Sequence, residues 1–96
     1  MIRSFRHLLA EDLFHDRVTA ATRRFPRELR PAAHRKLQYL NAAGRLRDLA
    51  VPPGNRLEAL RGDRRGCHSI RINERWRIVF RWEDQGDTDV EVVDYH

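Results

Sequence analysis

Hydrophobic positions near the start of the chain follow two different periods. Residues 2–5 alternate apolar and polar side chains, as a short strand does. Leu9, Leu13 and Phe14 then recur at helical spacing and predict a first helix. The segment 23–30 is highly charged and contains a proline, so we interpret it as a connection.

The most regular helical pattern lies in the stretch PAAHRKLQYLNAAGR. Pro31 suits a first helical turn, because its missing N–H would be unpaired there in any case. Ala33, Leu37 and Leu40 mark one apolar face, and Gly44 supplies a natural stop. A further short turn of helix is expected before the triplet PPG breaks the chain.

After that triplet the hydrophobic period falls to two. The segments RLEALRGD, GCHSIRIN, RWRIVFRWED and TDVEVVDYH alternate apolar and polar residues and are separated by short turn-like pieces. Four consecutive strands with short connections favour antiparallel hairpins. We therefore predict one α+β domain over residues 1–96, with two N-terminal helices packed on one face of a mainly antiparallel sheet.

Alternation also assigns side chains to the two faces of the predicted sheet. Trp76, Ile78, Phe80 and Trp82 share one side of their strand and are expected to face the helices. The other face gathers guanidinium groups on or near the strands, at Arg56, Arg61, Arg64, Arg65, Arg71, Arg77 and Arg81. These arginines are either a surface for a polyanion or a solvated face paired with carboxylates.

Charge favours the first of these interpretations. The chain has 19 Lys and Arg residues against 14 Asp and Glu, a formal charge of +5, and Lys36 is its one lysine. Arginine offers a planar fork of donors that matches phosphate, so a nucleic-acid partner is indicated. The alternative explanation for the high arginine content is that a GC-rich genome encodes arginine in place of lysine.

Cysteine and histidine usage argues against disulfides and metal sites. Cys67 is the sole cysteine, so it has no partner within the chain and supports no cysteine-based metal site. The histidines at 7, 15, 34 and 68 have no metal-binding spacing. The longest apolar run near the start, residues 8–10, is too short for a signal peptide or a membrane span, and a cytoplasmic location is expected.

The last predicted strand is followed by three side chains able to move protons, Asp94, Tyr95 and His96. RNA can be cleaved without a metal, because the ribose 2′-hydroxyl is an internal nucleophile beside the scissile phosphate. The protein must then align the atoms, move protons and stabilise phosphoryl charge. Structural alternatives stand beside this one: Tyr95 packs at a sheet edge, Asp94 pairs with an arginine, and His96 is solvated.

Three stretches together resemble one family. MIRSF, then PPGNRLEALRGDRRGCHSIRINERWRIVFRW, then VEVVDYH occur in the order and spacing of the HigB group of bacterial toxins, including its GraT-type members, within the RelE/ParE superfamily. The resemblance implies a RelE-like fold and metal-independent cleavage of mRNA at the ribosomal A site, with no cofactor. It also implies neutralisation by a HigA-like helix-turn-helix antitoxin, and contact with operator DNA only through the toxin–antitoxin complex.

Carried over residue by residue, the resemblance implies catalytic roles for Arg61, Arg77, Asp94, Tyr95 and His96. Family members commonly have lysine where this chain has Arg61, a change that keeps the positive charge but not a neutral-lysine base. RNA-binding roles are expected for the remaining arginines of the sheet half, Arg56, Arg64, Arg65, Arg71 and Arg81.

Position 58 is the clearest departure from part of the family. Some HigB toxins have a catalytic histidine there, whereas this chain, like the GraT-type members, has Glu58. A glutamate can orient an arginine or act as a base, and it can equally repel phosphate. Two other functions therefore remain open: a weakly catalytic or non-catalytic binder of ribosomal RNA, and a ParE-like gyrase poison.

Overall fold

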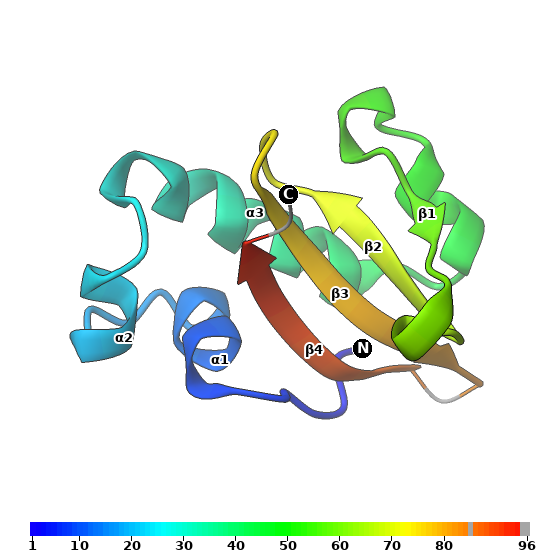
Figure 1. Cartoon of the computed structure of the whole chain (residues 1–96), viewed down its shortest axis with the longest axis horizontal. Coiled ribbons are helices and arrows are strands. Elements are labelled where there is room, and N and C mark those ends of the chain that lie inside the picture. Colours follow the sequence, from blue (N-terminus) through cyan, green and yellow to red (C-terminus); the bar gives the residue numbers. More distant parts are fainter. Residues whose placement is uncertain (85, 95–96) are drawn as a thin grey trace.

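The second half of the chain forms a single antiparallel sheet. The computed structural model describes residues 1–84 and 86–94. The strands are β1 (Glu58–Ala59), β2 (Cys67–Arg71), β3 (Trp76–Glu83) and β4 (Gly86–Asp94), in the spatial order 1-2-3-4 (Figure 1). The predicted α+β class with four consecutive antiparallel strands is confirmed.

The helices differ from the prediction in number. The expected pair is present as α1 (Leu8–Phe14) and α3 (Arg30–Ala42), but a third, single-turn helix α2 (Ala20–Arg23) lies between them. Short 3-10 turns occupy η1 (Arg27–Leu29), η2 (Leu46–Ala50), η3 (Pro53–Asn55) and η4 (Gly62–Arg64). Within the described residues, no helix is both long and apolar enough to cross a membrane.

The main core lies between the helices and one face of the sheet. Leu13 from α1 and Leu37 and Leu40 from α3 are buried against Ile78 and Phe80 of β3. Ile70, Ile72, Val90 and Val92 belong to the same cluster, and Trp76 and Trp82 pack on its margin. The predicted division of the strands into a helix-facing side and an opposite side is confirmed.

The N-terminal segment covers the outer edge of β4. Instead of a regular strand it forms two isolated parallel bridges, Ile2 with Asp87 and Phe5 with Val90. Further along, His7 Nε2 accepts a hydrogen bond of 2.9 Å from the Val92 N–H. Burial lowers the pKa of His7, which suits a neutral ring acting as acceptor. The segment satisfies edge groups that would otherwise invite pairing with another chain.

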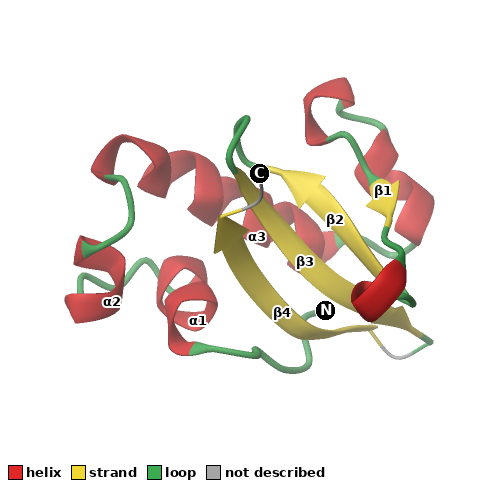
Figure 2. Cartoon of the chain, viewed as in Figure 1, coloured by secondary structure: helices red, strands yellow, loops and turns green. Residues whose placement is uncertain are grey.

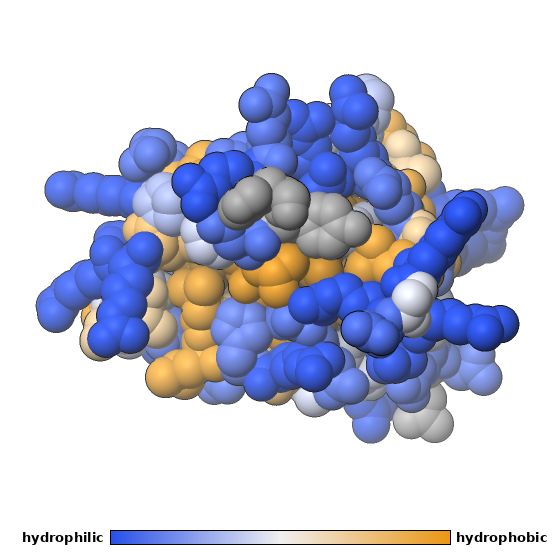
Figure 3. All heavy atoms as spheres, viewed as in Figure 1, coloured by the Kyte–Doolittle hydropathy of each residue, from blue (hydrophilic) through white to orange (hydrophobic). Residues whose placement is uncertain are grey.

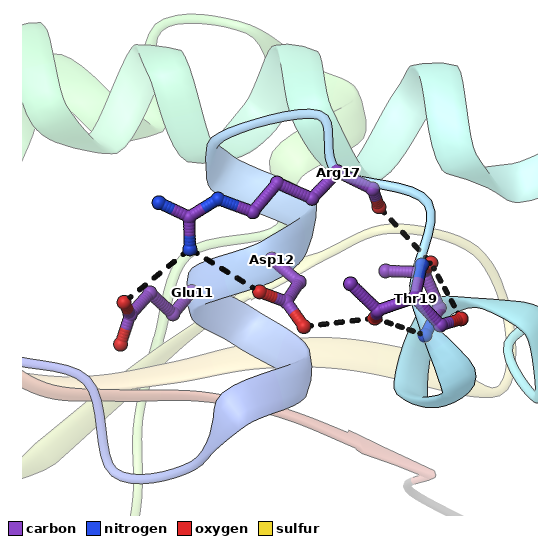
Figure 4. A network of polar contacts seen from close by, with 5 residues as sticks. Glu11, Asp12, Arg17 and Thr19 are labelled. Atoms are coloured by element: carbon purple, nitrogen blue, oxygen red, sulfur yellow. Dashed lines mark hydrogen bonds and ion pairs between the residues drawn. The ribbon is translucent and has the colours of Figure 1, made fainter.

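A buried carboxylate explains the unexpected helix α2. Asp12, in α1, is 2% exposed and accepts a hydrogen bond of 2.8 Å from the Thr19 hydroxyl (Figure 4). Thr19 is the N-cap of α2 and forms a capping box with Thr22. Arg17, in the intervening turn, approaches both Asp12 and Glu11. This network fixes the turn between α1 and α2.

We expect Asp12→Ala to lower the free energy of unfolding by about 1–3 kcal/mol, because it removes the buried carboxylate that accepts from the half-buried Thr19 cap. Glu11→Ala is the matched control. Glu11 contacts the same arginine, but its side chain is 42% exposed against 3% for Asp12, so its loss should cost about 0.5 kcal/mol or less. Urea denaturation of the two variants measures the difference, and equal losses would contradict the role given to Asp12.

Candidate functional site

Side chains on the side of the sheet away from the helices make up what we call the open face. It comprises Glu58, Leu60, Cys67, Ser69, Arg71, Arg77, Val79, Arg81, Glu91 and Val93. Directly opposed residues of neighbouring strands project from the same face, so the register fixes their arrangement. Figure 3 shows a hydrophobic middle on this side of the molecule, bordered by hydrophilic side chains.

Two rows of this face contain most of the charged residues. One row crosses all four strands, from Glu58 through Ser69 and Val79 to Glu91. The next row places Arg71 opposite Arg77, and Arg77 opposite Val93. Neighbouring rows on one face are about 7 Å apart along a strand, so carboxylates and guanidinium groups lie within reach of one another.

Arg77 lies near the start of the inner strand β3, on the open face. Its side chain is 14% exposed, and its Nη1 lies 3.5 Å from Glu58 Oε1. Glu58 itself is 52% exposed at the edge strand β1. A largely buried guanidinium keeps its charge and has little freedom to move, which suits a group that stabilises phosphoryl charge. The structure thus brings together two candidate residues, Arg77 and Glu58.

Arg61 shares a hollow with Glu58. It precedes η4 and is exposed, and with Glu58, Ala59 and Leu60 it lines an open hollow of about 520 Å³. The hollow lies beside the short edge strand β1 and is open to solvent. Glu58 is therefore the residue that these candidates share: it contacts Arg77 and lines the hollow with Arg61.

The apolar part of the open face was not predicted. Leu60, Cys67 and Val79 form a second small core, with Val93 packed against it, and Ser69 is 1% exposed. Figure 2 shows the single turn of η4 in front of the sheet on this side, and Arg64 of that turn contacts Glu91. The open face is therefore partly apolar and shielded from solvent, and it is not a fully solvated row of arginines.

Asp94 lies in the sheet, but its side chain is placed differently from that of Arg77. Asp94 pairs with Trp76 across β3 and β4, so its side chain projects from the same face of the sheet as the side chain of Trp76. Its carboxylate binds the guanidinium of Arg75, with Nε to Oδ1 at 3.2 Å and a second contact from Nη2. Pairing of Asp94 with an arginine, one of the structural alternatives, is thus confirmed. Tyr95 and His96 lie outside the described residues.

The expected RNA-binding arginines occupy different environments. Arg56, Arg65 and Arg81 are exposed. Arg71 is 23% exposed and lies 3.9 Å from Glu74, and its carbonyl accepts a hydrogen bond from Lys36. Arg64 is bound to Glu91 at 3.2 Å.

Sequence reasoning did not single out Glu91 or Arg75. The alternation of VEVV places Glu91 on the face opposite Val90 and Val92, which was the available signal. Its central position depends on the register between strands, which alternation does not give. Among the described residues, no group of three or more His, Cys, Asp or Glu side chains is arranged to hold a metal ion.

Comparison with known proteins identifies the family of this chain. The family model for the RelE-like toxin HigB of type II toxin–antitoxin systems matches residues 3–96. The chain belongs to the HigB-like toxin family. This HigB-like toxin is 45% identical to Toxin HigB-1 of Vibrio cholerae over 62 residues, 65% of each chain. It is 33% identical to an uncharacterized protein of Haemophilus influenzae over 61 residues, 64% of this chain and 60% of that one. The HigB-like chain thus spans less than two thirds of the length of either relative.

Proposed function

We propose that this HigB-like toxin is an endoribonuclease that cuts mRNA on the ribosome and so arrests translation. The observation that supports this most directly is the contact between Arg77 and Glu58, beside the hollow that Glu58 lines with Arg61. Membership of a toxin family of type II toxin–antitoxin systems supports the class of activity. RelE-like toxins are generally endoribonucleases, and arginine is well suited to a phosphodiester substrate.

The proposed reaction uses the RNA's own 2′-hydroxyl. Its oxygen forms a bond to the adjacent phosphorus, the bond from phosphorus to the 5′-oxygen breaks, and a 2′,3′-cyclic phosphate results. One proton leaves the 2′-hydroxyl and another reaches the departing 5′-oxygen. Arg77 and Arg61 stabilise the charge that develops on the phosphoryl oxygens. We assign the proton transfers and substrate alignment to Asp94, Tyr95 and His96, from their residue types.

Glu58 is given an orienting role in this proposal. Its carboxylate oxygen contacts Arg77 Nη1 at 3.5 Å, from a strand that neighbours neither β3 nor β4. An exposed glutamate in that position fixes the guanidinium in the absence of RNA and partly neutralises it. The same contact favours a second candidate function, in which the arginines dock on ribosomal RNA and block translation with little catalysis.

Partners follow from the family. A toxin of a type II system has an antitoxin, and we propose a HigA-like helix-turn-helix protein, through which the complex contacts operator DNA. The ribosomal A site and its mRNA are the proposed targets, in the cytoplasm. A helix-turn-helix reading frame next to the toxin's own would support this assignment.

Primer extension on mRNA from cells expressing the toxin tests the proposal. We expect new 5′ ends within translated reading frames, and their loss when translation of the same message is blocked at initiation. Growth arrest without such ends would favour the non-catalytic binder. Altered plasmid supercoiling without cleavage would instead indicate a ParE-like gyrase poison.

A further inference from the structure

Glu91 lies midway along β4, on the open face, and is largely removed from solvent. Its side chain is 10% exposed, and its Oε2 lies 3.2 Å from Arg64 Nη1 and 3.4 Å from Arg6 Nη1. Arg6 comes from the N-terminal segment on the outer edge of β4, and Arg64 from η4. One carboxylate therefore ties two distant segments of the chain to the centre of β4.

The segment that Arg64 belongs to is a compact loop with two glycines at positive φ. Residues 61–66 connect β1 to β2, and the loop is closed at its base by the hydrogen bond of 2.9 Å from Leu60 N–H to the Cys67 carbonyl. Gly62 and Gly66 have φ of +65° and +91°, values that few other residues adopt. The contact from Arg64 to Glu91 links the tip of this loop to β4, two strands away from β2.

Arg61 depends on this loop for its position. It is the residue before η4, and its carbonyl accepts a hydrogen bond of 3.3 Å from the Arg64 N–H. Displacement of Arg64 from the sheet therefore moves the backbone that places Arg61 in the hollow shared with Glu58. Arg64, at the tip of the loop, and Arg61, at the candidate site, are therefore joined by a single backbone turn.

A nearly buried glutamate is unfavourable on a surface that binds RNA phosphates unless it serves another purpose. Taking a carboxylate out of water costs several kcal/mol when it is unpaired, and a negative charge repels the substrate. Here two guanidinium groups compensate it, so Arg6, Arg64 and Glu91 together have a net charge of +1. The presence of Glu91 on this face is therefore best explained by its contacts with the two segments that contain Arg6 and Arg64.

We propose that Glu91 is a positioning residue, which holds the 61–66 loop across the sheet through Arg64 and thereby fixes Arg61 in the hollow that it lines with Glu58. The effect on RNA cleavage rests on the proposed function, whereas the effect on the loop does not. The proposal also gives Arg64 a role different from direct RNA binding: its guanidinium is engaged by Glu91 and acts on the substrate through Arg61.

Hydrogen exchange of the backbone amides of residues 61–66 tests the structural part. We expect Glu91→Gln and Arg64→Gln each to speed exchange in this loop by roughly fivefold to tenfold, the range for a partly buried ion pair. The double variant should show no further increase. Arg6→Gln, which removes the other contact to the same carboxylate, and Glu28→Gln, on η1, are controls that should leave the loop unchanged. Unchanged exchange in Glu91→Gln would overturn the proposal.

A double-mutant cycle on RNA cleavage tests the functional part. If Arg64 acts through Glu91, each single variant lowers kcat/KM by about tenfold, and the double variant lowers it by the same factor and no more. If Arg64 binds RNA directly, Arg64→Gln lowers kcat/KM by the same factor in the Glu91→Gln background as in the unmodified toxin. That result would show that the proposal is wrong. Absence of cleavage by the unmodified toxin would refute the proposed function alone, because the exchange measurement decides the loop contact independently.

Discussion

Arg77→Ala is expected to abolish growth arrest and mRNA cleavage while leaving the toxin folded. Removing one preorganised donor from a developing oxyanion typically costs about 10²–10³ in kcat. Arg77 has the features of such a donor: it is 14% exposed, lies on the open face, and contacts Glu58. Its side chain lies on the face away from the main core, so the helix–sheet packing should persist.

Arg35→Ala is the matched control for this experiment. Arg35 is an exposed arginine of α3, which packs on the other side of the sheet. The two variants lose the same charge, so a general effect of charge on RNA binding should weaken both equally. Circular dichroism checks the fold, and primer extension with growth curves checks the activity. Full toxicity of Arg77→Ala would remove Arg77 from the proposed site.

Asp87→Asn is expected to change how stability depends on pH. Asp87 is fully buried at the start of β4, and within the described part of the chain neither carboxylate oxygen has a hydrogen-bond partner. Burial raises the pKa of this carboxyl from 3.8 to about 7, against the opposing effect of the N-terminal ammonium group. Between these two values the folded protein keeps a proton that the unfolded chain releases.

The free energy of unfolding should therefore fall as pH rises from about 4 to 7, and the loss should be complete above the folded pKa. At about 1.4 kcal/mol per pKa unit, the whole effect is on the order of 4 kcal/mol. Asp87→Asn removes this titration, so its stability relative to the unmodified toxin should be higher at pH 8 than at pH 4.5 by that amount. Urea denaturation at the two pH values measures the difference.

Asp89→Asn serves as the control, because Asp89 lies in the same strand but is exposed. Asparagine also tolerates the left-handed φ of +51° found there. No comparable pH-dependent gain is expected for this variant. A parallel pH dependence in Asp87→Asn and the unmodified toxin would show that the carboxyl is ionised in the folded state.

Alternation predicted the sheet and its two faces, because the period of two follows directly from strand geometry. It did not predict how the strands align. The face of the sheet from which the Asp94 side chain projects depends on the pairing of Asp94 with Trp76. The register between β3 and β4 also shifts between Val79 and Arg81. The contact of Asp94 with Arg75, and the central place of Glu91, follow from that register.

Short elements escaped prediction because distant contacts determine them. Helix α2 has four residues, too few to form from propensity alone, and depends on the bond between Asp12 and Thr19. The first strand was predicted within residues 56–63, ending in a turn at Gly62–Asp63, but β1 is only Glu58–Ala59. The remainder of that segment turns back across the open face, where Arg64 meets Glu91. The catalytic roles of Tyr95 and His96 stay predictions.

The pairing of the N-terminal segment with β4 has a consequence for when the toxin becomes active during its synthesis. Ser4 and His7 each bond a backbone N–H 85 residues further along, at Asp89 and Val92. A growing chain therefore has its helices well before the strand against which they and the N-terminal segment pack. At roughly 5–20 residues per second, several seconds of translation separate α3 from β4. Until β4 is made, the ribosome that produces this toxin holds a chain without an assembled open face.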